Sequence, residues 1–371
     1  MTSRVLQNTS GLSGEKTPRK LGCIAFTERG LALATRVAQT LCASEDAADG
    51  APEWECDVAQ GYGPWRMLLA PWAEEHFASD DALLIVGSCG IAVRAVAPHV
   101  CSKSSDPAVI VVDEGGHWCI PILSGHIGGA NRLATRVAEI IGAQCVLTTA
   151  TDTRGLWAVD VWACDRGLII DNPSAIRLVS GRLLAGQTVR FYSDVPLADE
   201  PPEGVQVVDD ASVADVVLSP WKRRDASPDA LWLIPRCLCV GMGCRRGKGE
   251  GTIQTAWKKA CASLARKGLA VDERAVAHVR SIDLKANELG LLAFCRDHGW
   301  ELECASADEL ARVEGCVSAP SELVERVTGV DNVCERAALL GGGTVAWPKH
   351  AYDGVTVAVV VCQEPLSFGA A

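Results

Sequence analysis

The residues of this chain best suited to catalysis belong to a glycine-rich turn, Ser124–Gly129 (SGHIGG). The turn follows the apolar run Trp118–Leu123 and precedes residues 131–141, whose apolar residues recur at helical spacing. Glycines let a ligand approach the backbone closely, and the N–H groups at the start of a helix stabilise anions. Because histidine titrates near neutral pH, we predict His126 as a general acid or base. The simpler alternative is a histidine that caps or packs the turn.

Three carboxylates accompany this turn at the ends of neighbouring predicted strands. Asp113 and Glu114 follow Ala108–Val112, a β-branched run without polar alternation, as expected of a strand buried on both faces. Asp152 follows another strand-like run, CVLTT. Ligands of open α/β sheets bind beyond the carboxyl ends of the strands. We therefore predict that one of these carboxylates orients His126 or acts as the base itself. The alternative is a purely local role in turns and caps.

A basic segment later in the chain is suited to bind acidic groups. Gly241–Lys248 (GMGCRRGK) is predicted to run from a strand into a glycine turn. Arginine can bind a carboxylate through two parallel hydrogen bonds, so this turn is a candidate carboxylate cradle. A solvated charged loop is the alternative. The charged candidates at this strand end and at the next one are Arg245, Arg246, Lys248, Asp283 and Lys285.

The same segment also raises the hypothesis of a dinucleotide-binding oxidoreductase. Gly241-x-Gly243 after a strand matches the start of the pattern G-x-G-x-x-G. The third glycine falls one position late, at Gly247, and no acidic residue ends a strand roughly 20 residues further on. Asp283 is about twice as far away as that pattern requires. The dinucleotide reading is therefore the weaker one.

Composition places the chain among soluble globular proteins that do not bind nucleic acid. It has 371 residues, of which 48% are hydrophobic and 22% charged, enough for two or three domains with substantial cores. The formal net charge is −11, so the chain has no basic surplus for phosphates. An anionic ligand would need local basic clusters that overcome the overall negative charge.

The cysteine pattern and the N-terminal segment predict a cytoplasmic protein. The 17 cysteines include no C-x2-C pair, and most lie in apolar runs, which favours reduced thiols. Cys237, Cys239 and Cys244 could approach a metal, but no further His or Cys pair is near, and we predict no metal site. No apolar run approaches the roughly 20 residues of a membrane span, and the first 20 residues have no signal-peptide core. We expect no association with membranes.

Strand-like and helix-like segments alternate along the chain, which is typical of the α/β class. The N-terminal and middle βα units are expected to form one open, mostly parallel sheet region, followed by a separate C-terminal α/β domain. Residues 219–235 are rich in turn residues and are predicted as a linker. Thr252 is predicted to cap a helix. The predicted parts are a disordered tail (1–20), an N-terminal α/β domain (21–160), a middle region with linker (161–235) and a C-terminal α/β domain (236–371).

Long contiguous sequence motifs, called sequence words below, resemble those of a known family. From about Leu83 to Val361 the chain resembles the cobalt-precorrin-5A hydrolases (CbiG type) of the anaerobic cobalamin pathway. The matching words in the first half are GSCGIAVRAVAPHV, SSDPAVIVVDEGGHWCIPILSGHIGGANRLA and TTATDTRGLWAVD. Those in the second half are VGMGCRRG, SIDLKANELGLLAF, SELVERVTGVDNVCERAALL and PK followed by VTVAV. Words of this length in this order are far more specific than a single glycine motif.

The resemblance implies a hydrolase that opens the δ-lactone of a cobalt-bound, carboxylate-rich tetrapyrrole with water and releases acetaldehyde. The cobalt arrives inside the substrate, so the protein is expected to need no cofactor of its own. A non-catalytic tetrapyrrole carrier is the alternative. A homodimer and contacts with neighbouring cobalamin-pathway enzymes are left open. Within the matching words, the further substrate-binding candidates are Gly90, Arg94, Ser124, Gly125, Gly128, Gly129, Thr149, Gly243, Glu322 and Lys349.

Two features depart from the family pattern. Lys248–Gly251 is expected to delay the helix that follows the arginine turn, and Arg336 stands where a smaller or apolar residue is expected. The segment around the glycine-rich turn has few cations of its own, namely Arg132, Arg136 and Arg154. We therefore expect the C-terminal domain to supply cations as well, which predicts a site between the N-terminal and C-terminal domains.

Overall fold

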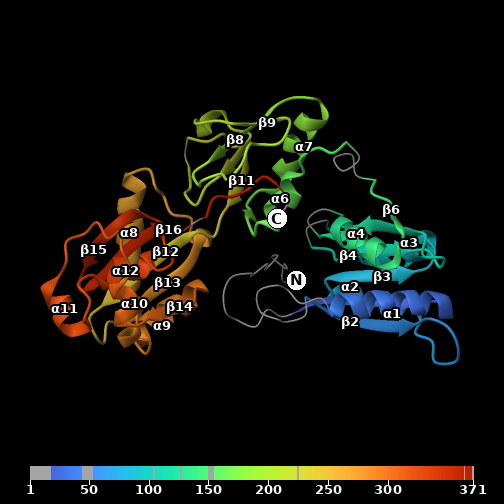
Figure 1. The fold of residues 1–371 in the computed structure, drawn as a ribbon, viewed down its shortest axis with the longest axis horizontal. Coiled ribbons are helices and arrows are strands. Elements are labelled where there is room, and N and C mark those ends of the chain that lie inside the picture. The colour runs from blue at the N-terminus through green and yellow to red at the C-terminus, as the bar shows by residue number, and fades with distance from the viewer. Residues whose placement is uncertain are drawn as a thin grey trace. The chain divides into compact units, whose positions relative to one another are not determined.

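The computed structural model describes residues 18–43, 53–102, 105–125, 128–148, 154–223, 225–362 and 364–369. The chain divides into two compact units, Met1–Val161 and Trp162–Ala371, which Figure 1 draws as ribbons. Within the described residues, the first unit contains one sheet and the second contains two. The α/β class, with mostly parallel strands in the N-terminal part and a separate C-terminal sheet, is confirmed.

The first unit is a six-stranded sheet with helices on both faces (Figure 1). The strands lie in the order β2-β1-β3-β4-β5-β6, and all neighbours are parallel except β4 and β5. The elements are β1 (Arg19–Ala25), α1 (Glu28–Cys42), β2 (Trp54–Gln60), α2 (Leu69–Ser79), β3 (Ala82–Val86), α3 (Cys89–Val96), β4 (Ala108–Val112), β5 (Trp118–Leu123), α4 (Ala130–Ile141) and β6 (Gln144–Cys145). Helix α6 (Val159–Asp165) leads into the second unit.

Two apolar layers hold the helices of the first unit to its sheet. Successive side chains of a strand point to opposite faces, so β1 contributes Leu21 and Cys23 to one layer and Ile24 to the other. Helices α1 and α4 cover the first layer, and α2 and α3 cover the second. Strands β3 and β4 are buried along their whole length, as their β-branched composition predicts.

A tight hairpin between β4 and β5 reverses the direction of the sheet's last two strands. Val112 pairs with Cys119 at one end of the hairpin, and Val109 pairs with Leu123 at the other. Strand β6 is parallel to β5. The carboxyl ends of β5 and β6 therefore lie at the edge where β1, β3 and β4 begin.

The βα elements of the middle region form a separate sheet in the second unit, instead of extending the sheet of the first unit as expected. Its order is β7-β11-β10-β8-β9, with only β7 antiparallel to its neighbour. Residues 219–235, predicted as a linker, contain β11, whose Leu231 and Leu233 are fully buried. The elements are β7 (Ile169–Ile170), α7 (Ile176–Leu184), β8 (Val189–Ser193), β9 (Val205–Val207), β10 (Val216–Leu218) and β11 (Leu231–Ile234).

The C-terminal sheet has the order β14-β13-β12-β16-β15, in which β12, β13 and β14 are parallel and β16 is antiparallel to both its neighbours. Helix α12 packs on β12, β13 and β16. The elements are β12 (Leu238–Cys244), α8 (Glu250–Arg266), β13 (Val276–Ile282), the 3-10 turn η5 (Asp283–Lys285), α9 (Leu289–His298), β14 (Leu302–Ala305), α10 (Ala307–Ala311), α11 (Glu322–Thr328), α12 (Val333–Leu339), β15 (Thr344–Tyr352) and β16 (Val355–Val361).

After β16 the chain returns to the middle sheet. Phe368 is buried, stacks on Trp162 at a ring distance of 5.5 Å and meets the edge of Phe191 at 5.2 Å. The Trp162 indole also donates a hydrogen bond to the carbonyl of Ser367. The C-terminal segment thus belongs to the core of the middle region.

Candidate active site

Among its described residues, the glycine-rich turn between β5 and α4 brings Ser124 and Gly128 into close contact. Ser124 has a left-handed backbone (φ 56°), and its hydroxyl donates to the carbonyl of Asp106 at 2.9 Å. A Cβ at Gly125 would come within 2.7 Å of Asn131 Oδ1, and one at Gly128 within 2.4 Å of the Ser124 Cβ. The turn therefore requires glycine at position 128, whereas a side chain at position 125 would displace the Asn131 side chain. The general acid or base predicted from sequence, His126, lies outside the described residues, as do Thr149 and Asp152.

Asp113 and Glu114 lie at the opposite edge of the sheet from Ser124, so they are not beside the described part of the glycine-rich turn, and their predicted role in orienting His126 stays a prediction. Both follow β4, and β5 returns antiparallel to β4, so its carboxyl end at Leu123 lies beside the start of β4. The sequence pattern gave no information on strand direction, and two strand ends close in sequence proved to be far apart along the sheet.

Asp113 builds the β4–β5 hairpin. Its carboxylate accepts hydrogen bonds from the backbone N–H groups of Gly115 (3.0 Å), His117 (2.7 Å) and Trp118 (2.6 Å). Burial by itself would raise the pKa of this carboxyl, but the hydrogen bonds from Trp118 and His117 outweigh it and lower the pKa. Glu114 is exposed. Among the other candidates, Gly90 lies in the first turn of α3, at the same edge as Asp113, and Arg94 is exposed in the last turn of that helix.

The structure adds a cation that sequence reasoning missed. The guanidinium groups of Arg19 and Arg132 lie 3.8 and 4.0 Å from the position that a Cβ would take at Gly129. Arg19 stacks on the Trp54 ring at 4.3 Å. Burial is the main reason why the pKa of Arg19 is lowered, and the neighbouring charge of Arg132 lowers it further. Nothing in the sequence links the start of β1 to this turn, because only the pairing of strands brings them together.

The basic turn after β12 meets two other segments at the carboxyl edge of the C-terminal sheet, the β15–β16 turn and the residues before α9. Lys248 forms an ion pair with Asp353 at 3.4 Å, and Lys285 forms one with Glu288 at 3.1 Å. Glu288 also accepts a hydrogen bond from the backbone N–H of Gly247 at 2.6 Å, which is the main cause of its lowered pKa. The turn is thus held in place by carboxylates that the sequence did not single out.

These ion pairs make the cradle less basic than the sequence indicates. Asp283 is exposed, and its carboxylate accepts a hydrogen bond from the backbone of Leu284. Arg245 and Arg246 are the exposed cations of the turn. Four cations at this edge (Arg245, Arg246, Lys248 and Lys285) face three carboxylates (Asp283, Glu288 and Asp353), a formal surplus of one positive charge.

Gly241 and Gly243 allow close packing against neighbouring elements. They therefore do not support the hypothesis of a dinucleotide-binding loop. Gly241 and Gly243 both lie inside β12, not in a turn. A Cβ at Gly241 would come within 1.8 Å of the Cys334 carbonyl oxygen on α12, and one at Gly243 within 2.6 Å of the Thr356 hydroxyl on β16. Helix α8 begins at Glu250 with Gly249 as its N-cap. The predicted cap at Thr252 is therefore wrong, and the helix is not delayed beyond Gly251.

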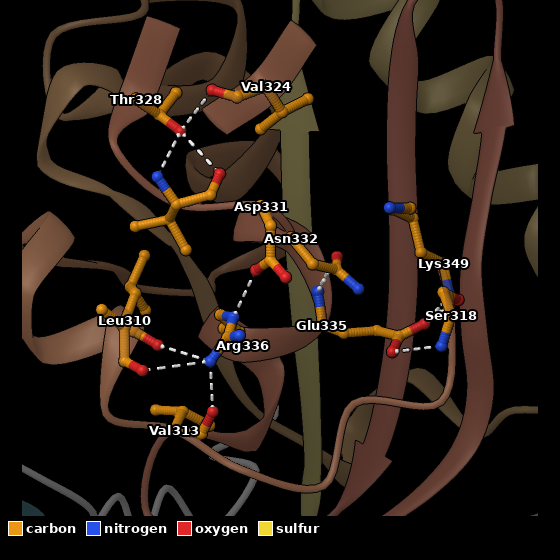
Figure 2. Close-up of polar contacts among 12 residues, drawn as sticks. Leu310, Val313, Ser318, Val324, Thr328, Asp331, Asn332, Glu335, Arg336 and Lys349 are labelled. Atoms are coloured by element: carbon orange, nitrogen blue, oxygen red, sulfur yellow. Dashed lines mark hydrogen bonds and ion pairs between the residues drawn. The ribbon is translucent and has the colours of Figure 1, made fainter. Parts of the chain in front are cut away.

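Lys349 and Glu322 differ sharply in their surroundings. Glu322 has a side chain that is 89% exposed and a loose contact with Arg326 at 3.5 Å. Lys349 is half-buried in β15, and its ammonium group donates to the Ala319 carbonyl at 3.3 Å. Its backbone N–H donates to the carboxylate of Glu335 at 2.6 Å (Figure 2).

Glu335 is the most deeply buried carboxylate of the network in Figure 2, and sequence reasoning did not identify it. Besides Lys349, it accepts hydrogen bonds from the backbone N–H groups of Val317 (2.9 Å) and Ser318 (3.1 Å) and from the Ser318 hydroxyl. Burial would raise its pKa, but these donors together lower it. Glu335 therefore ties α12 to β15 and to the segment before α11.

The neighbouring Arg336, for which a smaller or apolar residue was expected from the resemblance, makes several polar contacts. It donates to the Asp331 carboxylate at 2.8 Å (Figure 2). Its Nη1 nitrogen donates to the carbonyls of Leu310 and Ala311, at 3.3 and 3.2 Å, and to that of Val313. The first two carbonyls belong to the last turn of α10, so Arg336 caps that helix.

Comparison with known proteins identifies the family. Family models for the cobalamin synthesis G N-terminal region, the cobalamin biosynthesis central region and the cobalamin synthesis G C-terminus match residues 71–152, 157–235 and 238–360. A cobalt-precorrin-5A hydrolase from Salmonella typhimurium is 32% identical over 93% of this chain and 99% of its own length. Another, from Priestia megaterium, is 29% identical over 91% of this chain and 94% of its own length. The chain belongs to the cobalamin synthesis G family, which confirms the resemblance seen in the sequence words.

A solved structure of a cobalamin biosynthesis protein G homolog from Sulfolobus solfataricus covers 93% of this chain and 98% of its own length, at 19% identity and a TM-score of 0.39. Within the described residues, no helix is both long enough and apolar enough to cross a bilayer. The same residues contain no group of three or more His, Cys, Asp or Glu side chains arranged to hold a metal ion.

Proposed function

We propose that this protein is a cobalt-precorrin-5A hydrolase of anaerobic cobalamin biosynthesis. It adds water to the δ-lactone of a cobalt-bound tetrapyrrole and then releases acetaldehyde, giving cobalt-precorrin-5B. The observation that carries the proposal is the 32% identity to the Salmonella typhimurium cobalt-precorrin-5A hydrolase over nearly the full length of both chains. Cobalt enters as part of the substrate, and the protein needs no resident cofactor for this reaction.

The reaction has two steps with different demands. Water attacks the lactone carbonyl and the ring C–O bond breaks, which leaves a carboxylate and a free hydroxyl. The hydroxyl then loses its proton and becomes the carbonyl of acetaldehyde, while the electron pair of the broken C–C bond passes to the macrocycle. The protein must supply a base and donors for the developing oxyanion. Our candidate for the base is His126, with the N–H groups of the Ser124–Gly129 turn as donors.

The charges near this turn support an anionic substrate. The whole chain carries a formal charge of −11, so a carboxylate-rich tetrapyrrole must be attracted locally. Arg19 and Arg132 provide two cations beside Gly129. Guanidinium groups bind carboxylates with well-defined geometry, so this pair can orient the substrate against the turn.

The test is single-turnover release of acetaldehyde from cobalt-precorrin-5A by the wild type and by His126→Ala. Loss of a general acid or base lowers the rate by roughly 10²–10⁴-fold. His117→Ala is the matched control, because His117 is an exposed histidine of the same unit at the opposite edge of the sheet. Its rate should equal that of the wild type.

Two outcomes would count against parts of this proposal. If the wild type binds cobalt-precorrin-5A but releases no acetaldehyde, the protein is a tetrapyrrole carrier and the hydrolase assignment fails. If acetaldehyde is released and His126→Ala is as fast as His117→Ala, the hydrolase assignment stands but His126 is not the acid or base.

A further inference from the structure

The C-terminal domain has a pocket of about 190 Å³ between the first turns of α8 and the turn that joins β15 to β16. Its lining residues are Gly251, Thr252, Thr255, Ala256, Lys259, Tyr352 and Asp353. The next four lining residues occupy positions i, i+3, i+4 and i+7 of α8. Residues at this spacing share one face of a helix. The pocket is therefore formed by one face of α8 and the tip of the β15–β16 hairpin.

The polar groups of this pocket favour an anion. Lys259 is exposed, and no carboxylate of the described residues lies within 4 Å of its ammonium nitrogen. The one acidic residue of the lining, Asp353, is neutralised by Lys248 at 3.4 Å. Side-chain carbons of Arg245 and Lys248 lie 3.1 Å from the position that a Cβ would take at the adjacent Gly354. The lining thus contains one cation without a carboxylate partner among the described residues, Lys259, and one carboxylate that is already paired, Asp353.

The size of the pocket limits what it can hold. Sites for whole small molecules usually measure about 300–1,000 Å³, so a macrocycle does not fit into 190 Å³. A carboxyethyl arm has roughly five non-hydrogen atoms, and at about 10–15 Å³ of water-accessible space each, it needs roughly 50–75 Å³ and leaves room for water. The pocket therefore fits a single acidic side arm of a larger molecule.

We infer that this pocket binds one peripheral carboxylate of an anionic tetrapyrrole, with the Lys259 ammonium as its ion partner and the Thr252 hydroxyl as a second donor. The inference rests on the proposed function for the identity of the substrate and adds a binding subsite to it. The basic turn after β12 lies next to the pocket through the Lys248–Asp353 ion pair. Its exposed arginines can then hold further carboxylates of the same molecule.

The test compares Lys259→Ala with Lys258→Ala, a matched control that removes an exposed lysine of the same helix outside the pocket. Lys259→Ala should raise the KM for cobalt-precorrin-5A roughly 10-fold with kcat unchanged, because it removes one charge-assisted hydrogen bond. Lys258→Ala should leave both constants as in the wild type. Thr252→Val should raise the KM by a smaller factor. Equal melting temperatures of the variants exclude a loss of folding.

A binding measurement separates this inference from the proposed function. Uroporphyrin, a metal-free tetrapyrrole with carboxylates around its rim, is titrated against each variant and followed by its fluorescence. A Kd that rises roughly 10-fold in Lys259→Ala and not in Lys258→Ala supports the subsite even if no acetaldehyde is ever released. The inference is overturned if the two lysine variants bind uroporphyrin equally well, or if the wild type does not bind it.

Discussion

Replacing Glu335 by glutamine should destabilise the C-terminal domain strongly, although the two side chains have nearly the same shape. The carboxylate is fully buried and accepts four hydrogen bonds. Its Oε2 accepts hydrogen bonds from the backbone N–H groups of Val317 and Ser318. Its Oε1 accepts hydrogen bonds from the Ser318 hydroxyl and the backbone N–H of Lys349. In glutamine one of these oxygens becomes an NH₂ donor.

The cost follows from the better of the two amide orientations. An NH₂ that faces Val317 and Ser318 would leave two backbone donors without an acceptor. An NH₂ that faces the Ser318 hydroxyl leaves only the Lys349 N–H unpaired, because the hydroxyl can rotate and accept. An unsatisfied buried donor costs about 1–3 kcal/mol, and each remaining bond loses roughly 1 kcal/mol when its acceptor becomes neutral. We expect a total loss of about 3–5 kcal/mol in the free energy of unfolding.

Hydrogen exchange and urea unfolding can measure this loss at the affected segments. In Glu335→Gln, the backbone amides of Val317, Ser318 and Lys349 should exchange faster, and the domain should unfold at lower urea concentration. Glu325→Gln is the control, since Glu325 is an exposed glutamate of the same domain. A destabilisation below about 1 kcal/mol, or exchange no faster than in Glu325→Gln, would refute the reasoning.

The same variant should respond differently to acid. The pKa of Glu335 in the folded protein lies below its ordinary value of 4.5. Its contribution to stability is therefore fully present above pH 4.5 and is lost as the pH falls through the folded pKa. The stability difference between wild type and Glu335→Gln should narrow below pH 4.5. A difference that stays constant on acidification would contradict a charged Glu335.

Two other substitutions test the packing of the second unit. Gly241→Ala should lower the free energy of unfolding by roughly 3 kcal/mol or more, because its Cβ would lie 1.8 Å from the Cys334 carbonyl oxygen and would displace α12 from the sheet. An unchanged urea midpoint would contradict this. Phe368→Ala should lower the free energy of unfolding by about 3 kcal/mol, because it leaves a cavity where the phenyl ring packs on Trp162. Tryptophan fluorescence should then report unfolding at lower urea, whereas a midpoint equal to that of the wild type would mean that the C-terminal segment does not stabilise the middle region.

Much of the fold and the family could be read from the sequence because those signals are local. The unbroken β-branched run Ala108–Val112 predicted a strand buried on both faces, and β4 is one. The helical spacing of residues 131–141 predicted a helix, and α4 (Ala130–Ile141) is that helix. The sequence words identified the family, since each word is a contiguous string that needs no structure to be recognised.

The composition of the candidate site depended on contacts between distant parts of the chain. Sequence spacing does not encode strand direction, so Asp113 was expected beside the glycine-rich turn and lies at the other edge of the sheet. Only strand pairing brings Arg19 to Gly129. Only the packing of α12 on the sheet brings Gly241 against the Cys334 carbonyl and buries the Glu335 carboxylate. The sequence by itself therefore determined the elements, the family and the candidate residues near the strand ends. The tertiary structure decided which of these residues meet, because burial and charge pairing arise only when separate elements pack together.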